Sequence, residues 1–110
     1  MSAQSKETPL LDLIASINAS AIEASSLDLE GQMLARIAAL VAVDAPPASY
    51  MMNLGAAGEV GVNEERVQGV LAAIAPIVGT ARVVSAAGKM MRALGLALEL
   101  AELEAEAEEE

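Results

Sequence analysis

The side chains able to do chemistry in this sequence are few, because it contains no cysteine and no histidine. Without thiols it has no disulfides, no thiolate zinc site and no thiol redox chemistry. Without imidazole it lacks the commonest general base and the commonest metal ligand in proteins. We therefore expect no metal and no cofactor. The remaining candidates are ligand-binding residues: Arg36, Ser49, Tyr50, Asn53 and Arg82.

Arg36 is the most informative candidate. On a helix of 100° per residue it shares one stripe with Met33 and Leu40, so its side chain faces the apolar side. A buried charge requires a partner, and no carboxylate stands three or four residues away on the same helix. The partner is therefore a ligand anion or an acid on another helix or subunit. The acids available for such a salt bridge are Glu30, Asp44, Glu59 and Glu64.

Ser49 and Asn53 are four residues apart, on one face of a predicted helix, with Tyr50 adjacent. Together they suggest a small pocket with a polar tip that orients a ligand. The alternative is structural: Ser49 bonds the backbone near the helix start, and Asn53 bonds a neighbouring helix. No base stands beside Ser49 in the sequence, so we do not expect it to act as a nucleophile.

The elements that position these residues are predicted to be helices throughout. No segment alternates apolar and polar residues as strands do. Thr8 before Pro9, Asp28 and Asn63 are typical helix N-caps, and Pro46-Pro47 and Gly79 interrupt helices. These signals predict an all-α, compact bundle of five to six helices, over residues 9–25, 28–43, 48–60, 63–78 and from Thr80 onward.

The chain is long enough for one domain, which we place at residues 9–103. Residues 1–8 form an N-terminal tail. Residues 104–110 are almost entirely glutamate, and acidic residues at a helix C-terminus oppose the helix dipole. We therefore expect this acidic tail to fray.

Apolar residues are unusually abundant in this chain. They make up 55% of it, and the 8 glycines raise the fraction to roughly 62%, against about 45–50% in ordinary domains. A chain of this length buries only about 60–70% of its unfolded surface, so apolar surface is left exposed. We therefore expect a homo-oligomer. Four glycines inside predicted helices suggest close helix approach: Gly55, Gly58, Gly69 and Gly88.

The net charge of −10 excludes some partners. Nucleic acids and anionic membranes bind clustered lysine and arginine, and the six basic residues here are scattered. The longest uncharged run, 67–81, has 15 residues, whereas a membrane span needs about 20. The N-terminus holds no signal-peptide core. We expect a cytoplasmic protein.

Two segments carry a resemblance to a known family: Leu27-Asp28 with 33–41, and the run 50–71. The second holds an alanine-rich helix end, a glycine turn, a capped helix opening with Glu64-Glu65, and the Val70-Leu71 pair. Over roughly 27–94 the chain resembles the carboxymuconolactone decarboxylase and alkylhydroperoxidase D family. The resemblance implies helical protomers that assemble as closed homotrimers or homohexamers, with sites near subunit boundaries.

The chemistry of that family does not carry over to these residues. Its peroxidase branch uses Cys-x-x-Cys followed four residues later by histidine. If Asn53 occupies the histidine position, the cysteine positions fall on Pro46 and Ser49, which cannot form a disulfide. The decarboxylase branch keeps histidine in this region, and here Asn53 again replaces it.

Whether the chain is an enzyme therefore stays open, and we compare three hypotheses. The first is a protein that has lost both activities and acts as an oligomeric small-molecule-binding or scaffold protein. The second is a lyase or isomerase that holds a small carboxylate with Arg36 or Arg82 and moves a proton with Glu59. The third is partner recognition through the acidic tail.

Overall fold

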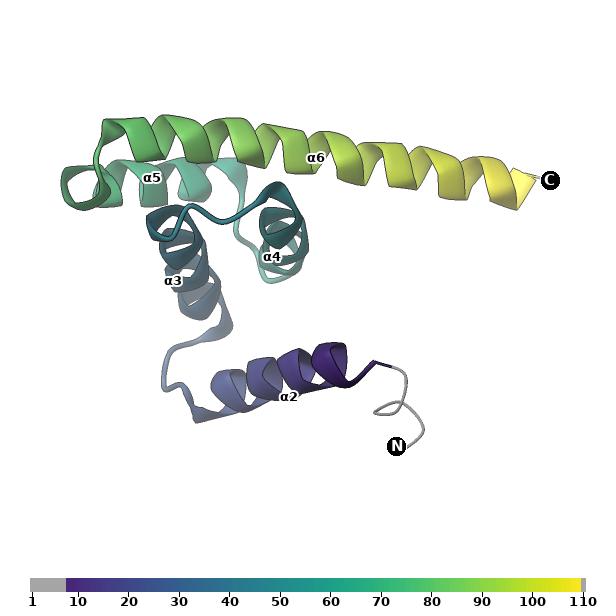
Figure 1. Cartoon of the computed structure of the whole chain (residues 1–110), viewed down its shortest axis with the longest axis horizontal. Helices are drawn as coiled ribbons and strands as arrows, with labels where there is room; N and C mark the ends of the chain where they lie inside the picture. The colour runs from purple at the N-terminus through teal and green to yellow at the C-terminus, as the bar shows by residue number, and fades with distance from the viewer. Residues whose placement is uncertain (1–7, 110) are drawn as a thin grey trace.

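Helices form the whole of the chain that the computed structural model describes, residues 8–109, apart from short connections. Side chains are described outside 96–101 and 108–109. The helices are α2 (Pro9–Ala24), α3 (Leu29–Ala42), α4 (Pro47–Glu59), α5 (Glu64–Val78) and α6 (Thr80–Glu109). Figure 1 shows α3 and α4 beneath the antiparallel pair α5 and α6, with α2 at the far end of the molecule. The all-helical prediction is confirmed.

Two of the predicted N-caps form with their side chains. Asp28 Oδ1 accepts from the backbone N–H of Gly31 at 2.7 Å, and Asn63 Oδ1 accepts from that of Arg66 at 2.9 Å. Each bond satisfies a donor that the first helical turn leaves free, which stabilises a helix by about 1 kcal/mol. Thr8 precedes Pro9 as predicted, but its hydroxyl donates to Asp12 Oδ1 at 3.3 Å instead of capping the backbone.

The helix ends follow the predicted breaks to within two residues. Gly61 (φ 98°) follows α4, and Gly79 (φ 93°) separates α5 from α6, so both adopt the left-handed conformation that glycine favours. Asp44, after α3, also has a positive φ of 58°, which aspartate tolerates better than most residues. Pro46 and Pro47 then start α4. Thr80 is the first residue of α6 rather than its cap.

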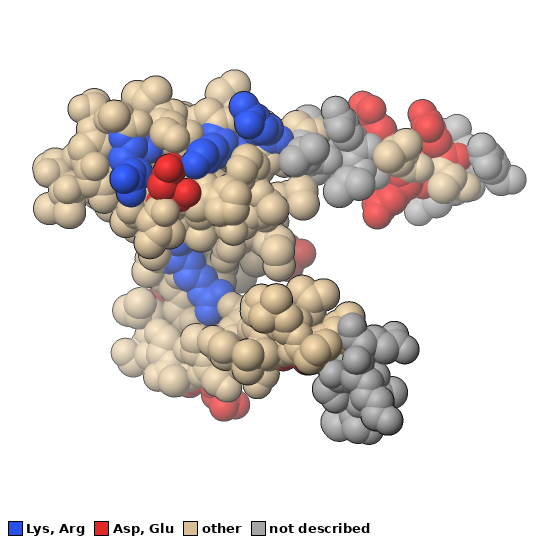
Figure 2. Space-filling view, in the orientation of Figure 1, with Lys and Arg blue, Asp and Glu red and all other residues tan. Residues whose placement is uncertain are grey.

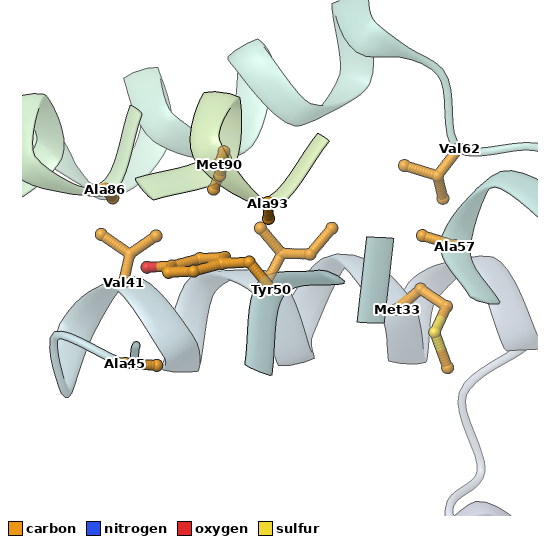
Figure 3. Close-up of a cluster of buried hydrophobic side chains, with 10 residues drawn as sticks. Met33, Val41, Ala45, Tyr50, Ala57, Val62, Ala86, Met90 and Ala93 are labelled. Atoms are coloured by element: carbon orange, nitrogen blue, oxygen red, sulfur yellow. The ribbon is translucent and has the colours of Figure 1, made fainter. Parts of the chain in front are cut away.

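The core lies where α3 meets α4, α5 and α6. Ile37 and Val41 on α3 and Tyr50 on α4 are its largest fully buried side chains. Figure 3 shows Val41 and Tyr50 facing small residues of α6, among them Ala86 and Ala93. Because alanine lets helices approach closely, this aliphatic core packs with a single aromatic ring.

By contrast, α2 contributes no buried residue. Its apolar side chains Leu10, Leu13, Ile14 and Ile17, which we call the α2 stripe, are between 50% and 66% exposed. The radius of gyration is 15.9 Å, whereas a compact domain of this length has about 13 Å. The protomer is therefore more open than a self-contained domain.

Helix α6 continues through the acidic segment to Glu109. We expected 104–110 to fray, whereas the described part of this segment is helical. The reason is composition, because alanine, leucine and glutamate are strong helix formers and no glycine or proline follows Gly95. Glu110 and residues 1–7 lie outside the described residues.

We expected the glycines inside helices to allow close helix approach, and within one protomer this prediction is wrong. A Cβ built on Gly55, Gly58, Gly69 or Gly88 meets no atom within 4 Å. Alanine and methionine make the close helix contacts instead, while these glycines face open space. Their presence is therefore not required by packing between the helices of one chain.

Among the described helices, none is both long enough and apolar enough to cross a membrane. The long helix α6 fails because its second half is rich in glutamate.

Candidate functional site

Arg36 lies at the contact between α3 and α2. Its Nη1 donates to Asn18 Oδ1 on α2. An acid of the same protomer is not the partner among the described residues: Glu30 pairs with Arg66 and Asp44 with Lys89, both at 2.8 Å. A ligand anion or an acid of another subunit stays a prediction. Arg36 is only half-buried, so an amide oxygen together with solvent suffices for its charge. Beside it lies a cavity of about 230 Å³, lined by Ile14, Ile17, Asn18, Ala21 and Arg36.

Ser49 and Asn53 lie half-buried on one face of α4, as their spacing predicted. The Asn53 amide nitrogen donates to the backbone carbonyl of Ser49 at 2.8 Å. The Ser49 backbone N–H in turn donates to the carbonyl of Pro46 at 3.1 Å. These two hydrogen bonds, which join Pro46, Ser49 and Asn53, therefore stabilise the first turns of α4. Their role in binding a ligand stays a prediction.

Tyr50 lies in the core, not on a pocket wall. It is 0% exposed, and its hydroxyl is buried with no hydrogen-bond partner among the described residues. In Figure 3 the ring lies between α3 and α6 with its hydroxyl beside Val41. Burial raises the pKa of the phenol above 10.0, and the negative charge of Asp44 raises it further. Tyr50 therefore stays neutral at physiological pH.

Arg82 belongs to a polar cluster that joins α6 to the end of α3, and sequence reasoning missed its other members. Arg82 Nη1 donates to the carbonyl of Ala42 at 2.5 Å. Lys89 Nζ lies 2.8 Å from Asp44 Oδ1, and the Ser85 hydroxyl donates to the same oxygen at 3.4 Å. The available signal was the spacing of 82, 85 and 89, which places all three on one helix face.

The hydrogen bond from Lys89 is the main reason why the pKa of Asp44 lies below 3.8, and the charges of Lys89 and Arg82 lower it further. Figure 2 shows this arrangement as a row of basic side chains along α6, interrupted by an acidic one. Asp44 is exposed, so this cluster resembles a clasp between two elements more than a ligand site.

A second feature that the sequence analysis missed is an apolar groove between α4, α5 and α6, with a volume of about 400 Å³. We call it the α4–α6 groove. Met91 is 75% exposed in it, and Glu64 and Gln68 supply its polar groups. The other residues that line it are Leu54, Val67, Leu71, Ala87, Met90 and Leu94. Its signal in the sequence was the three- and four-residue spacing of apolar residues on α5 and α6.

The described carboxylates are mostly exposed and lie apart from one another. Among the acidic side chains that the structure describes, Asp12 and Glu30 are half-buried and the rest are exposed. No three of them gather where they could hold a metal ion, within the described part of the chain. Glu59, the acid expected to move a proton, is exposed at the end of α4 and forms no ion pair with either candidate arginine.

The described chain is an all-helical protein in which Ser49 and Asn53 lie in the first turns of α4. The sequence profile of the carboxymuconolactone decarboxylase family matches residues 9–92. The chain belongs to this family, and the match includes α2, which lay outside the 27–94 resemblance. Comparisons with curated proteins and with solved structures gave no significant match.

We predict that Tyr50→Phe leaves the protein as stable as the wild type or raises its free energy of unfolding by up to about 1 kcal/mol. The variant removes a buried hydroxyl that lacks a partner while keeping the ring in the core. Chemical denaturation monitored by circular dichroism measures the change. A loss of more than about 1 kcal/mol would mean that the hydroxyl forms a hydrogen bond in solution.

We predict that Asp44→Asn lowers stability at pH 7 and that the difference from the wild type shrinks below pH 3.8. The lowered pKa of Asp44 means that its stabilising contribution is present above 3.8 and is lost as the pH falls through the folded-state value. Asparagine tolerates the positive φ, so the substitution tests charge rather than backbone strain.

Thermal melts of both proteins from pH 7 to pH 2.5 measure this difference. Asp28→Asn is the matched control, because asparagine keeps the helix cap there. A constant difference between wild type and Asp44→Asn across the whole range would contradict the role of Lys89.

Proposed function

We propose that this chain is a non-catalytic member of the carboxymuconolactone decarboxylase family that acts as a self-associating helical scaffold in the cytoplasm. The observation that carries the proposal is the apolar surface that one protomer leaves open. This surface includes the α2 stripe and the α4–α6 groove, and further exposed apolar side chains lie at Val43, Met52 and Ile77. A homotrimer or homohexamer would bury this surface.

The total accessible area supports this reading. The chain exposes 7721 Å², whereas a compact monomer of 11.2 kDa exposes about 5,700 Å². The surplus of about 2,000 Å² exceeds the roughly 800 Å² that one partner contributes to a standard interface. Part of this surplus belongs to the half of α6 that extends beyond the bundle (Figure 1), and part to the open α2 stripe and α4–α6 groove.

The loss of catalysis is supported at the positions that correspond to the reactive groups of the family. Pro46 has no reactive side chain, and the Asn53 amide bonds the Ser49 carbonyl. The Ser49 hydroxyl has no histidine or lysine on α4 to activate it. The alternative lyase or isomerase needs an arginine and an acid together. Arg36 bonds Asn18, and Arg82 bonds the carbonyl of Ala42 near the exposed Asp44, whereas Glu59 forms no ion pair with either arginine.

A small-molecule-binding protein is the second candidate function. The α4–α6 groove favours it, since about 400 Å³ lined mostly by apolar side chains with a few polar groups is typical of ligand sites. Such a ligand would be mainly apolar, with a group that Gln68 and Glu64 can bond at one end. Recognition through the acidic tail is a third possibility, and deletion of 103–110 with the fold intact would test it.

We predict that the purified protein consumes no organic hydroperoxide above the uncatalysed rate, with or without added dithiol. Without a cysteine the chain has no group that can reduce peroxide and be regenerated, apart from slow methionine oxidation. Peroxide is measured over time, with a family member that has the Cys-x-x-Cys pair as positive control. Repeated turnover would contradict the proposal.

We predict that native mass spectrometry gives a multiple of the 11.2 kDa protomer mass, with three or six subunits. Leu13→Glu lowers the subunit number because it places a charge on the α2 stripe. Ile77→Glu is the matched control on α5, where the side chain is 85% exposed and lies outside the groove.

A monomeric wild type would refute the scaffold function. An oligomer that retains extra mass after purification would favour the small-molecule-binding function, and the mass would begin to identify the ligand.

A further inference from the structure

Helix α2 is attached to the bundle by a few polar contacts, and its apolar face is open. Gln32 is the one polar side chain buried in the described core, and its amide donates to the carbonyls of Leu27 at 3.0 Å and Ile22 at 3.5 Å. The Arg36–Asn18 bond ties α2 to α3 one turn further back. These contacts hold the C-terminal half of the helix at the bundle and leave its N-terminal half projecting (Figure 1).

Leu10 and Leu13 of the α2 stripe lie on the projecting half, whereas Ile14 and Ile17 also line the cavity beside Arg36. The four residues follow the three- and four-residue spacing of a single helix face. From residue 10 to residue 17 this face extends about 10 Å along the helix axis. An apolar face held in place away from its own core is typical of a helix that packs against another molecule.

The α4–α6 groove has the matching shape. Its floor on α6 runs from Ala87 to Leu94 and its wall on α5 from Glu64 to Leu71, so each side also extends about 10 Å along its helix. Two antiparallel helices leave a groove that a third helix can occupy at the usual interaxial distance of about 8–10 Å. Exposed methionines such as Met91 adapt well to such a neighbour.

We propose that the α2 stripe of one copy packs into the α4–α6 groove of a second copy of this chain. The inference rests on the self-association proposed above and names the two surfaces that meet. It joins two unlike surfaces, so repetition around an axis closes a ring in which each copy both gives and receives a helix.

A second copy is favoured over a foreign partner because the chain supplies both complementary surfaces. Pairing of two α2 stripes would cover less, because both grooves would stay open.

The absence of cysteine allows a direct test by cross-linking. Single variants with cysteine on the α2 stripe (Leu10→Cys, Leu13→Cys and Ile17→Cys, in turn) are each mixed with Met91→Cys and treated with a mild copper oxidant. A disulfide forms only where Cα atoms come within about 7 Å, and every product of the mixture is intermolecular. Ile77→Cys replaces Met91→Cys in the matched control.

We expect at least one stripe variant to give tenfold more mixed disulfide with Met91→Cys than with Ile77→Cys, measured by intact mass. Circular dichroism and native mass spectrometry first verify that each variant keeps the helix content and subunit number of the wild type. Equal yields with both partners, or no mixed product at all, would overturn the docking while leaving an oligomeric scaffold in place.

Two further outcomes also overturn the proposal. If the stripe variants cross-link mainly with themselves, the α2 helices pair with each other. If the wild-type protein is a monomer by native mass spectrometry, both the docking and the proposed function fail.

Discussion

The packing of α3 against α4, α5 and α6 is the contact on which the rest of the structure depends. Ile37 and Val41 are completely buried in it, opposite a row of small residues on α6. Burial of such side chains contributes about 1.5–3 kcal/mol each, and no other contact between helices in the described chain buries as many large ones. Tyr50 adds the one aromatic ring. The Asp44–Lys89 ion pair joins α6 to the connection between α3 and α4 at the end of this contact.

The small size of this core leaves α2 and the far half of α6 outside it. A core built from alanine, valine and isoleucine is narrow, so it is completed by four helices and leaves no face for a fifth. Gln32 and Arg36 attach α2 to the core through polar bonds, which do not bury its leucines. The apolar excess of the composition therefore ends up on surfaces that one protomer cannot cover.

The separation of two partners along the chain decides whether the sequence could predict their interaction. The caps at Asp28 and Asn63, the break at Pro46-Pro47 and the left-handed Gly79 depend on neighbours within a few residues, so they were predictable. The partner of Arg36 is 18 residues away, and that of Asp44 is 45 residues away. Those pairs exist only once the helices are placed, so periodicity within one helix could not reveal them.

The acidic half of α6 has to be compatible with any assembly of this chain. Each copy carries a net charge of −10, and copies with that charge repel one another. Much of the charge lies on the part of α6 that extends beyond the bundle in Figure 1, where Glu102, Glu104 and Glu106 are exposed. Charges separated by more than about 8 Å are largely screened at physiological ionic strength. If the acidic ends of α6 point away from the contact, the repulsion between the copies costs little. The basic side chains in the first half of α6 also offset the negative charge of the acids on α2. The distribution of charge along α6 is therefore consistent with copies that meet at the bundle and keep their acidic ends apart.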